Sequence, residues 1–518
     1  MPALRCTAGA YTISKHRDMQ NLTSANGSRD RLGINVSQIL VLALLFAASA
    51  VLETVKLSSI RDPEIWRHLA VGNWILANHA WPRVGLFSQA GNLPWHDVQW
   101  GFDVFSAMGY RIMGLWTIPA ILICFRLALA VIAFLLAGGT RRFWVAAALS
   151  ASAQYILATS GPGAVIFSIV LSGIELICLL EIRRTGNVRF LYLLPPLFLL
   201  WANLDADFVY GLALYAFFLL ALSMQGEEQS LDGLFSGAAL AGLACAAATF
   251  FNPYGYHPYA AFFAEHSDAI NVNLPGYLAM SFHRPQDYAL LLLTMAAFLA
   301  LGLRRSRDVF LFLLLASSTF LAFRAERTGW LVTLASLAVI GETLRSPSAR
   351  ESEESLNQRG QIVLVAATFA LFVSGLALAV PTFITHQDLQ ARISAHFPVH
   401  ACDYIRQHAL PHPLFNTYPW GSFLTWNLPE YPVALDGRRG LYSVEEEMNY
   451  AKVMKADIPY QSFQPMSQAQ TLLLERTSVM GEAFRELHGF QVAYEDDLAI
   501  VLVHQTNQLA ATSLDGNE

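Results

Sequence analysis

Apolar runs long enough to cross a lipid bilayer recur along most of this chain, and they constrain its fold more than any other feature. An α-helix rises about 1.5 Å per residue, so about 20 apolar residues cross the roughly 30 Å of hydrocarbon. We therefore predict a mainly α, polytopic membrane protein with about eleven spans, several of them shorter than the ideal. The predicted spans are 36–57, 115–137, 143–160, 163–182, 190–204, 207–224, 231–251, 287–303, 308–323, 327–344 and 361–380.

The composition of the chain excludes two broad classes of protein. Hydrophobic residues make up 54% and charged residues 14% of the 518 residues, whereas charged residues are usually about 25% of a soluble protein. The net charge is −6, and the chain has no polybasic tract, so nucleic-acid binding is not expected. Membrane lipids are the expected surroundings.

Basic residues in the short connections predict the orientation, because cytoplasmic loops are enriched in Lys and Arg. They cluster in alternate connections, which places the N-terminus in the cytoplasm and the C-terminus outside. The loops 58–114 and 252–286 then face outward together with the C-terminal region. The basic residues of the inside connections are Arg141, Arg142, Arg183, Arg184, Arg189, Arg304, Arg305, Arg307, Arg345, Arg350 and Arg359.

The chain divides into three parts. Residues 1–34 form a polar cytoplasmic tail, 35–380 a transmembrane module, and 381–518 a soluble extracytoplasmic domain. Helical and strand patterns alternate in this last part, which predicts a small α/β domain. We expect a helix at 388–408, strands at 413–415, 421–426 and 431–435, and a hairpin of 491–494 with 498–503.

Acidic residues and a histidine begin the first outward loop. Asp62, Pro63 and Glu64 precede an amphipathic helical pattern with Trp66 and His68, typical of a helix on the membrane surface. One interpretation is purely structural, because Asp caps helices well and Pro suits the first helical position. The other is that Asp62, Glu64 and His68 gather at the mouth of the membrane core. Glu64 and His68, four residues apart, share a helix face.

Further polar residues fall on the same predicted side. Asp97 is either another helix cap or part of the site. Asp205 and Asp207 either form an ordinary turn or hold a divalent cation such as Mg²⁺ or Mn²⁺ through their oxygens. Arg324 and Arg327 either reach lipid headgroups or clamp the phosphate of a bound lipid.

The motifs resemble a large, poorly characterised group of bacterial membrane proteins of the GT-C glycosyltransferase-like superfamily. The pattern Asp-Pro-acidic-x-Trp-x-His-Leu-x-x-Gly-x-Trp-Ile starts at Asp62, and Trp-x-x-x-Gln-Trp starts at Trp95. Trp201-Ala202-Asn203-Leu204, Asn252-Pro253-Tyr254-Gly255 and Asp436-Gly437-Arg438 continue the likeness. The resemblance covers about 58–503 and implies location in the bacterial cytoplasmic (inner) membrane.

The resemblance also implies an activity. A GT-C enzyme moves a sugar from a polyprenyl-phosphate-linked donor to an extracytoplasmic acceptor. Asp62 and Glu64 would be catalytic, with Asp62 as general base, while His68, Asp97, Arg324 and Arg327 would bind substrate. The carboxylate pair Asp205 and Asp207 would hold any cation.

The sequence departs from this pattern where the resemblance implies an Arg-Pro, since Gly161-Pro162 stands there. Trp66-Arg67, Gln99-Trp100 and Asp205-Ala206 also differ from the expected residues. The alternative hypothesis is therefore a non-enzymatic scaffold or transporter-like protein related to these enzymes. Glu175 is the clearest acidic residue within a predicted span, and transporters usually carry more of them, which favours the enzyme.

Overall fold

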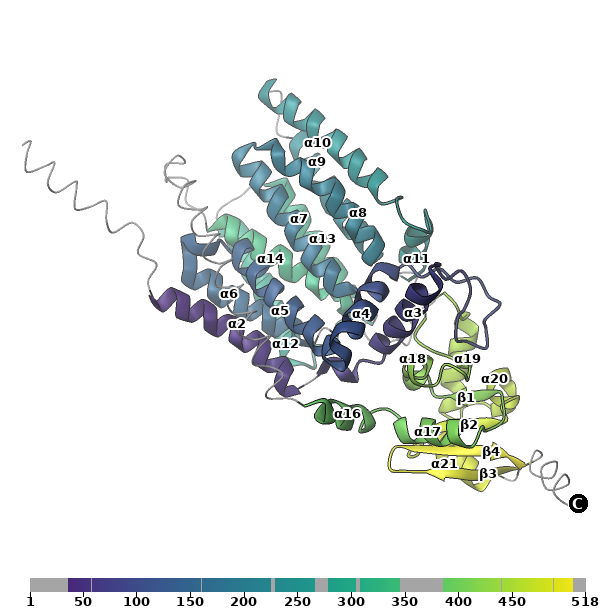
Figure 1. Cartoon of the computed structure of the whole chain (residues 1–518). Helices are drawn as coiled ribbons and strands as arrows, with labels where there is room; N and C mark the ends of the chain where they lie inside the picture. Colours follow the sequence, from purple (N-terminus) through teal and green to yellow (C-terminus); the bar gives the residue numbers. More distant parts are fainter. Residues whose placement is uncertain are drawn as a thin grey trace, which may run out of the picture.

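The computed structural model describes residues 36–56, 58–159, 161–224, 229–265, 278–303, 308–344, 385–438, 440–487 and 489–505. Within them lie a large group of apolar helices and a smaller C-terminal α/β part (Figure 1). The mainly α prediction, with a small C-terminal sheet, is confirmed. The predicted tail 1–34 and the predicted span 361–380 lie outside the described residues.

The apolar helices follow the predicted spans closely. Each predicted span in the described residues coincides with a helix, although 190–204 begins as a 3-10 segment, η6 (Val188–Leu193). In Figure 1 these helices run side by side as one bundle. They are α2 (Val36–Lys56), α5 (Thr117–Leu136), α6 (Phe143–Ile156), α7 (Val165–Thr185), α8 (Leu194–Leu204), α9 (Phe208–Ser223), α10 (Gln229–Ala248), α12 (Pro285–Leu303), α13 (Val309–Arg324) and α14 (Gly329–Thr343).

Length, composition and exposed apolar side chains make this a membrane protein. Three described helical segments are long and apolar enough to cross a bilayer: Trp100–Leu136, Val165–Thr185 and Pro285–Leu303. Shorter apolar helices accompany them. Leu240 and Leu243 of α10 are each 70% exposed. Water would not favour such a surface, whereas lipid tails do.

Small residues bring the helices of the bundle into close contact. A Cβ atom added at Gly341 of α14 would lie 2.0 Å from the Leu136 carbonyl oxygen of α5. One added at Gly173 of α7 would lie 2.4 Å from Ile132 Cγ2. Helices in lipid associate through such close packing, because the surrounding lipid tails are as apolar as the helices themselves.

The first loop places two helices between the bundle and the C-terminal part (Figure 1). The short segment η2 (Ser58–Arg61) leads into α3 (Glu64–Asn78), and α4 (Trp100–Met113) continues through η3 (Gly114–Trp116) into α5. The predicted helix after Asp62 is thus present, but it is covered rather than lying on a surface. Trp66 packs edge-on against Phe397 and Phe423 of the C-terminal part.

The C-terminal part contains one four-stranded sheet. Its strand order is β1-β2-β4-β3, with β1 and β2 parallel and the other pairs antiparallel. The elements are α16 (His386–Ser394), α17 (Val399–Gln407), β1 (Leu414–Asn416), α18 (Tyr418–Asn427), α19 (Val444–Met454), η8 (Tyr460–Ser462), α20 (Gln464–Ser467), β2 (Thr471–Glu475), α21 (Val479–Glu486), β3 (Phe490–Glu495) and β4 (Ala499–His504).

The local predictions for this part are partly confirmed. The hairpin is present as β3 and β4. The helix predicted at 388–408 is instead α16 and α17, separated at Pro398, because proline disfavours a helical residue before it. The strand predicted at 421–426 is wrong: these residues lie in α18, which has proline in its first turn. The strand predicted at 431–435 is also wrong, because it is reduced to a bridge between Val433 and Ser88.

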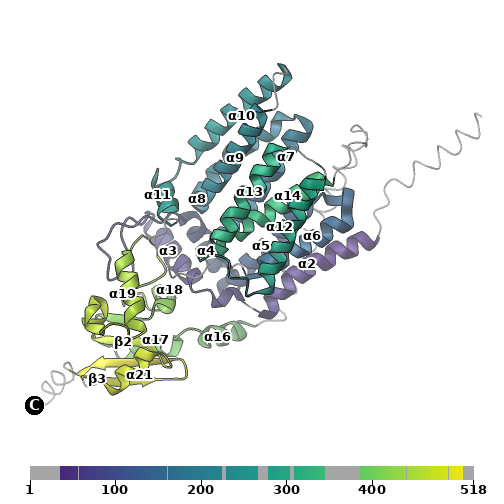
Figure 2. The same cartoon turned by 180° about the vertical axis from the view of Figure 1, so that it is seen from behind.

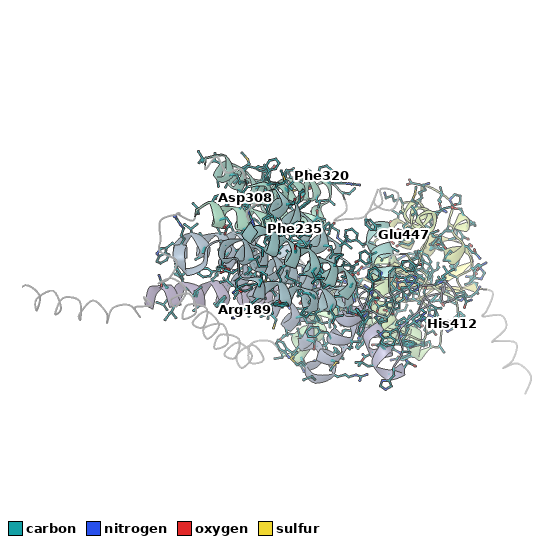
Figure 3. The ribbon with its side chains drawn as sticks, turned by 90° about the horizontal axis from the view of Figure 1, so that it is seen from above. Arg189, Phe235, Asp308, Phe320, His412 and Glu447 are labelled. Atoms are coloured by element: carbon teal, nitrogen blue, oxygen red, sulfur yellow. The ribbon has the colours of Figure 1, made fainter. Side chains whose placement is uncertain are left out.

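The C-terminal part is docked firmly on the first loop. The backbone of Gln89 donates to the Val433 carbonyl at 2.9 Å, and the Val433 amide donates to the Phe87 carbonyl at 2.8 Å. The Gln89 side chain donates to the Leu414 carbonyl at 2.6 Å. Figure 2 shows from behind how the C-terminal part lies beside α3, and in Figure 3 His412 and Glu447 lie on the C-terminal side. One apolar core, including Trp95, is shared across the contact.

Two further elements complete the wall facing the C-terminal part. The short helix α11 (His257–Glu265) follows α10, and the segment η7 (Glu326–Thr328) joins α13 to α14. The bundle also contains η4 (Gly139–Arg142) and η5 (Leu157–Thr159). Residues from the starts of α12 and α14 and from η7 lie around one cavity with residues of the first loop and of the C-terminal part.

Candidate functional site

A cavity of about 540 Å³ lies where the first loop, the helical bundle and the C-terminal part meet. It brings together residues far apart in the sequence, from Asp62 to Gly440. Of the residues predicted from the sequence, those lining it are Asp62, Glu64, His68, Asp97 and Arg327. Arg324, Asp205 and Asp207 are not among its lining residues.

Asp62 lines the cavity, and its two carboxyl oxygens have different surroundings. The Glu64 amide donates to Asp62 Oδ1 at 2.9 Å, so this oxygen accepts from the first amide of α3, but the N-cap residue is Pro63 and not Asp62 as the structural interpretation predicts. The other oxygen, Oδ2, lies against Gly161. Burial and the nearby charge of Glu64 raise the pKa of Asp62 to about 6, against the opposing effect of Arg67. Oδ1 of Asp62 thus accepts from the start of α3, and Oδ2 has no hydrogen-bond partner in the described residues.

Glu64, Arg67 and His68 form one connected group on α3. Arg67 Nη2 donates to Glu64 Oε2 at 3.2 Å and lies 3.3 Å from His68 Nε2. His68 Nδ1 lies 2.5 Å from Asp103 Oδ1. Because a guanidinium can only donate, Nε2 is the acceptor and Nδ1 carries the proton that it donates to Asp103. Burial and the charge of Arg67 lower the pKa of His68 to about 3, so its ring stays neutral.

Asp97 and Asp103 form a buried carboxyl pair behind His68. Asp97 Oδ1 accepts from the Gln99 amide at 3.3 Å. Burial, followed by the charge of Asp103, raises the pKa of Asp97 well above its usual value. Both Oδ2 atoms are buried and have no hydrogen-bond partner in the part of the chain that the structure describes. Burial also raises the pKa of Asp103, to about 7.

Asp103 was missed in the sequence because it lies inside the apolar stretch that forms α4. The signal that could have found it is its position as the acidic residue in the first turn of that helix. Its contact with His68 spans 35 residues, which no local pattern reveals. Gly72 makes the contact between the two helices close, since a Cβ there would lie 2.0 Å from the Asp103 carbonyl oxygen.

A second group of charges lines the opposite wall. Arg284 donates to Asp287 Oδ1 at 3.0 Å and also pairs with Glu326. Arg327 Nη2 lies 3.7 Å from Asp207 Oδ2, and the Arg327 side chain is 22% exposed. Of the two predicted phosphate ligands, Arg327 faces the cavity, whereas Arg324 ends α13 outside its lining. Arg67, Arg284 and Arg438 also line the cavity, and the sequence did not single out any of them as a site residue.

Asp205 and Asp207 are buried and bonded to protein groups. Ser168 Oγ donates to Asp205 Oδ2 at 2.5 Å, and Gln99 Nε2 donates to Asp205 Oδ1 at 3.2 Å. In the part of the chain that the structure describes, no three His, Cys, Asp or Glu side chains are grouped to hold a metal ion. These side chains therefore do not form a ready ligand set for Mg²⁺ or Mn²⁺, and the cation stays a prediction.

The C-terminal domain contributes a wall of the cavity. Gly437, Arg438 and Gly440 line it. Arg438 Nη2 lies 2.7 Å from Asp436 Oδ2, and its guanidinium also donates to the Leu86 carbonyl. The guanidinium carbon lies 5.2 Å from the ring centre of Trp95. The sequence marked this segment only as part of the family resemblance and gave it no role in the site, because its partner Leu86 is more than 300 residues away.

Comparison with known proteins finds similarity to solved structures but no family. The chain matches no protein-family profile and no curated protein. Among solved structures it is similar to the crystal structure of ArnT from Cupriavidus metallidurans bound to undecaprenyl phosphate, at 14% sequence identity and a TM-score of 0.47. The match covers 89% of this chain and 97% of the other.

Proposed function

We propose that this protein is a membrane glycosyltransferase that moves a sugar from a polyprenyl-phosphate-linked donor to an acceptor outside the cytoplasmic membrane. The observation that carries the proposal is the cavity, which gathers Asp62, Glu64, His68, Asp97 and Arg327 at one end of an apolar helical bundle. A lipid-linked substrate needs this arrangement, because its chain stays in the bilayer while its sugar reaches polar groups.

Asp62 acts as the general base in this proposal. Its Oδ2 accepts the proton of an acceptor hydroxyl while the hydroxyl oxygen attacks the anomeric carbon of the donor sugar. The bond between that carbon and the phosphate oxygen breaks, and polyprenyl phosphate leaves with the bonding electrons. A carboxylate with a pKa of about 6 is ionised at neutral pH and still basic enough to take the proton.

The remaining cavity residues support this step. Glu64 helps to raise the pKa of Asp62 through its charge. Arg327 and Arg284 face the leaving phosphate and offset its charge. Asp97 offers its second carboxyl oxygen to the sugar, whereas His68, whose two ring nitrogens already contact Arg67 and Asp103, keeps Arg67 in place beside the cavity. No step uses a metal ion.

The test is a panel of polyprenyl-phosphate sugars added to the purified full chain in detergent, with products followed by mass spectrometry. The proposal expects one donor to be consumed with release of polyprenyl phosphate. Consumption that depends on an added acceptor lipid or glycan would identify the acceptor class. If no donor in a broad panel is consumed, the proposal is wrong.

One observation favours the non-enzymatic alternative. Each cavity arginine already has a carboxylate partner: Arg67 with Glu64, Arg284 with Asp287, Arg327 with Asp207, and Arg438 with Asp436. A donor phosphate must therefore exchange partners with these carboxylates. A protein that binds polyprenyl phosphate without consuming any donor would support a scaffold instead.

The proposed orientation, with the cavity outside, is supported by charge. Arg183 pairs with Asp308 at 2.7 Å, and Arg184 pairs with Glu342, where the C-terminal ends of α7 and α14 meet the start of α13. This end of the bundle is opposite the cavity, and basic residues favour the cytoplasm. A periplasmically active phosphatase fused after residue 390 is expected to be active, and one fused after Arg305 inactive. The reverse pattern would contradict the orientation.

A further inference from the structure

Gly161 leaves room for one of the two candidate catalytic carboxylates. A Cβ atom added at Gly161 would lie 2.0 Å from Asp62 Oδ2 and 3.2 Å from Asp62 Cγ. Gly161 stands where the family resemblance implies an arginine, so any side chain here would displace Asp62. The cation that acts on Asp62 is instead Arg67, whose positive charge lowers the pKa of the Asp62 carboxyl.

Gly437 leaves room for the other carboxylate, from the opposite side. A Cβ atom added at Gly437 would lie 2.3 Å from Glu64 Oε1 and 3.3 Å from Glu64 Cδ. The second oxygen of Glu64 is held by Arg67 at 3.2 Å. Gly437 belongs to the C-terminal domain, so the position of Glu64 depends on both parts of the molecule. Neither glycine needs the left-handed backbone region, so alanine would act through the carboxylate alone.

We propose that Gly161 and Gly437 are positioning residues, each of which reserves the space of one carboxylate, Asp62 or Glu64. The C-terminal domain is then an integral part of the site rather than an appended module. This inference rests on the proposed function only for its effect on turnover. The contacts themselves can be tested without any substrate.

The first test measures where the carboxylates lie. Full-length wild type, Gly161→Ala and Gly437→Ala in detergent are labelled with a water-soluble carbodiimide and glycine ethyl ester across pH, and the modified residues are quantified by mass spectrometry. In Gly161→Ala the displaced Asp62 leaves its buried place, so the pH midpoint of its labelling falls by about one unit. In Gly437→Ala the displaced Glu64 loses its ion pair with Arg67. The rate at which Glu64 is labelled therefore changes about two- to fivefold.

The matched control is Gly163→Ala, because a Cβ atom there meets nothing within 4 Å. It should leave the labelling of both carboxylates at the wild-type level. If Gly161→Ala and Gly437→Ala also label like wild type, the proposal is overturned. If either variant is unstable, adding Asp62→Ala to Gly161→Ala, or Glu64→Ala to Gly437→Ala, should restore the thermal midpoint. If the losses in thermal midpoint from the two substitutions simply add in the double variant, the proposal is also overturned.

Turnover then separates this inference from the proposed function. With a donor that the wild type consumes, both alanine variants should lose about 10- to 100-fold in kcat with donor KM unchanged, because a small misplacement of a reacting group is costly. Unchanged kcat despite altered labelling would overturn the catalytic importance of the two positions. If wild type consumes no donor, the function fails while the labelling result still stands.

Discussion

Two acidic pairs with the same spacing, Asp62 with Glu64 and Asp205 with Asp207, lie in very different surroundings. The first pair begins α3 and lines the cavity. The second lies between α8 and α9, where Ser168, Gln99 and Arg327 already contact its oxygens. The sequence offers both as functional, and the structure separates them by what faces each carboxylate. An acid is available for chemistry when one oxygen remains unclaimed by the protein.

The same comparison explains how one residue can serve two purposes. Asp62 accepts from the first amide of α3 through Oδ1, and its Oδ2 lies against Gly161, which also lines the cavity. Both oxygens of Asp205 accept from side chains, because Gln99 donates to Oδ1 and Ser168 to Oδ2. A capping interpretation and a catalytic one are therefore compatible for Asp62, and the following variants distinguish their contributions.

The largest effect is expected from Asp62→Ser. Serine accepts backbone hydrogen bonds at a helix start nearly as well as aspartate, so the thermal midpoint should be no lower than that of wild type. It cannot accept the proton, so turnover should fall by about 10²- to 10⁴-fold. The control is Asp62→Ala, which also lacks the oxygen that accepts from the Glu64 amide and should be less stable than Asp62→Ser by about 0.5 to 2 kcal/mol. A fully active Asp62→Ser would leave Asp62 as a cap alone.

The next effect separates the two arginines predicted to bind phosphate. Arg327→Ala removes a cavity cation and should raise donor KM by about 10- to 100-fold, as expected for a charged hydrogen bond. Arg324→Ala should have the smaller effect, because Arg324 is outside the cavity lining. Arg327→Lys should recover part of the affinity. Equal effects of the two alanine variants would contradict the assigned geometry.

Much of the fold could be predicted because membrane spans depend on local hydropathy. Much of the site could not, because its contacts join distant residues: His68 meets Asp103, and Arg438 meets Leu86. The strand wrongly predicted at 421–426 shows a further limit. Its aromatic residues favour strands locally, yet in α18 they pack on α3, and Trp66 meets Phe423. Tertiary packing decides such segments.

A smaller effect tests the cation predicted at Asp205 and Asp207. Because protein groups already bond to these carboxylates, we expect EDTA to leave the thermal midpoint and turnover of wild type unchanged. The control is the double variant Asp205→Asn with Asp207→Asn, measured with and without EDTA. If EDTA lowers the thermal midpoint or turnover of wild type but not of the double variant, the cation site is established. The two acidic pairs would then be more alike.

The last effect concerns how the thermal stability of the protein depends on pH. The pKa of Asp62 is raised from 3.8 to about 6, so the folded protein holds this proton more tightly than the unfolded chain. The contribution of protonated Asp62 to the free energy of unfolding is present at low pH and is lost as pH rises between about 4 and 6. Asparagine caps equally well and does not ionise. The thermal midpoint of Asp62→Asn should therefore rise relative to wild type between about pH 4 and 7, and a constant difference would contradict the raised pKa.

The most direct test compares Asp62→Asn with Asp205→Asn in one donor-consumption assay, at matched thermal stability. Both substitutions remove one negative charge, and both leave an amide oxygen that can accept hydrogen bonds. The account predicts that Asp62→Asn loses about 10²- to 10⁴-fold in turnover because it cannot take the acceptor proton. Asp205→Asn should keep most of the wild-type rate. Wild-type turnover by a stable Asp62→Asn protein would contradict the central claim and direct attention to Glu64 and Asp97.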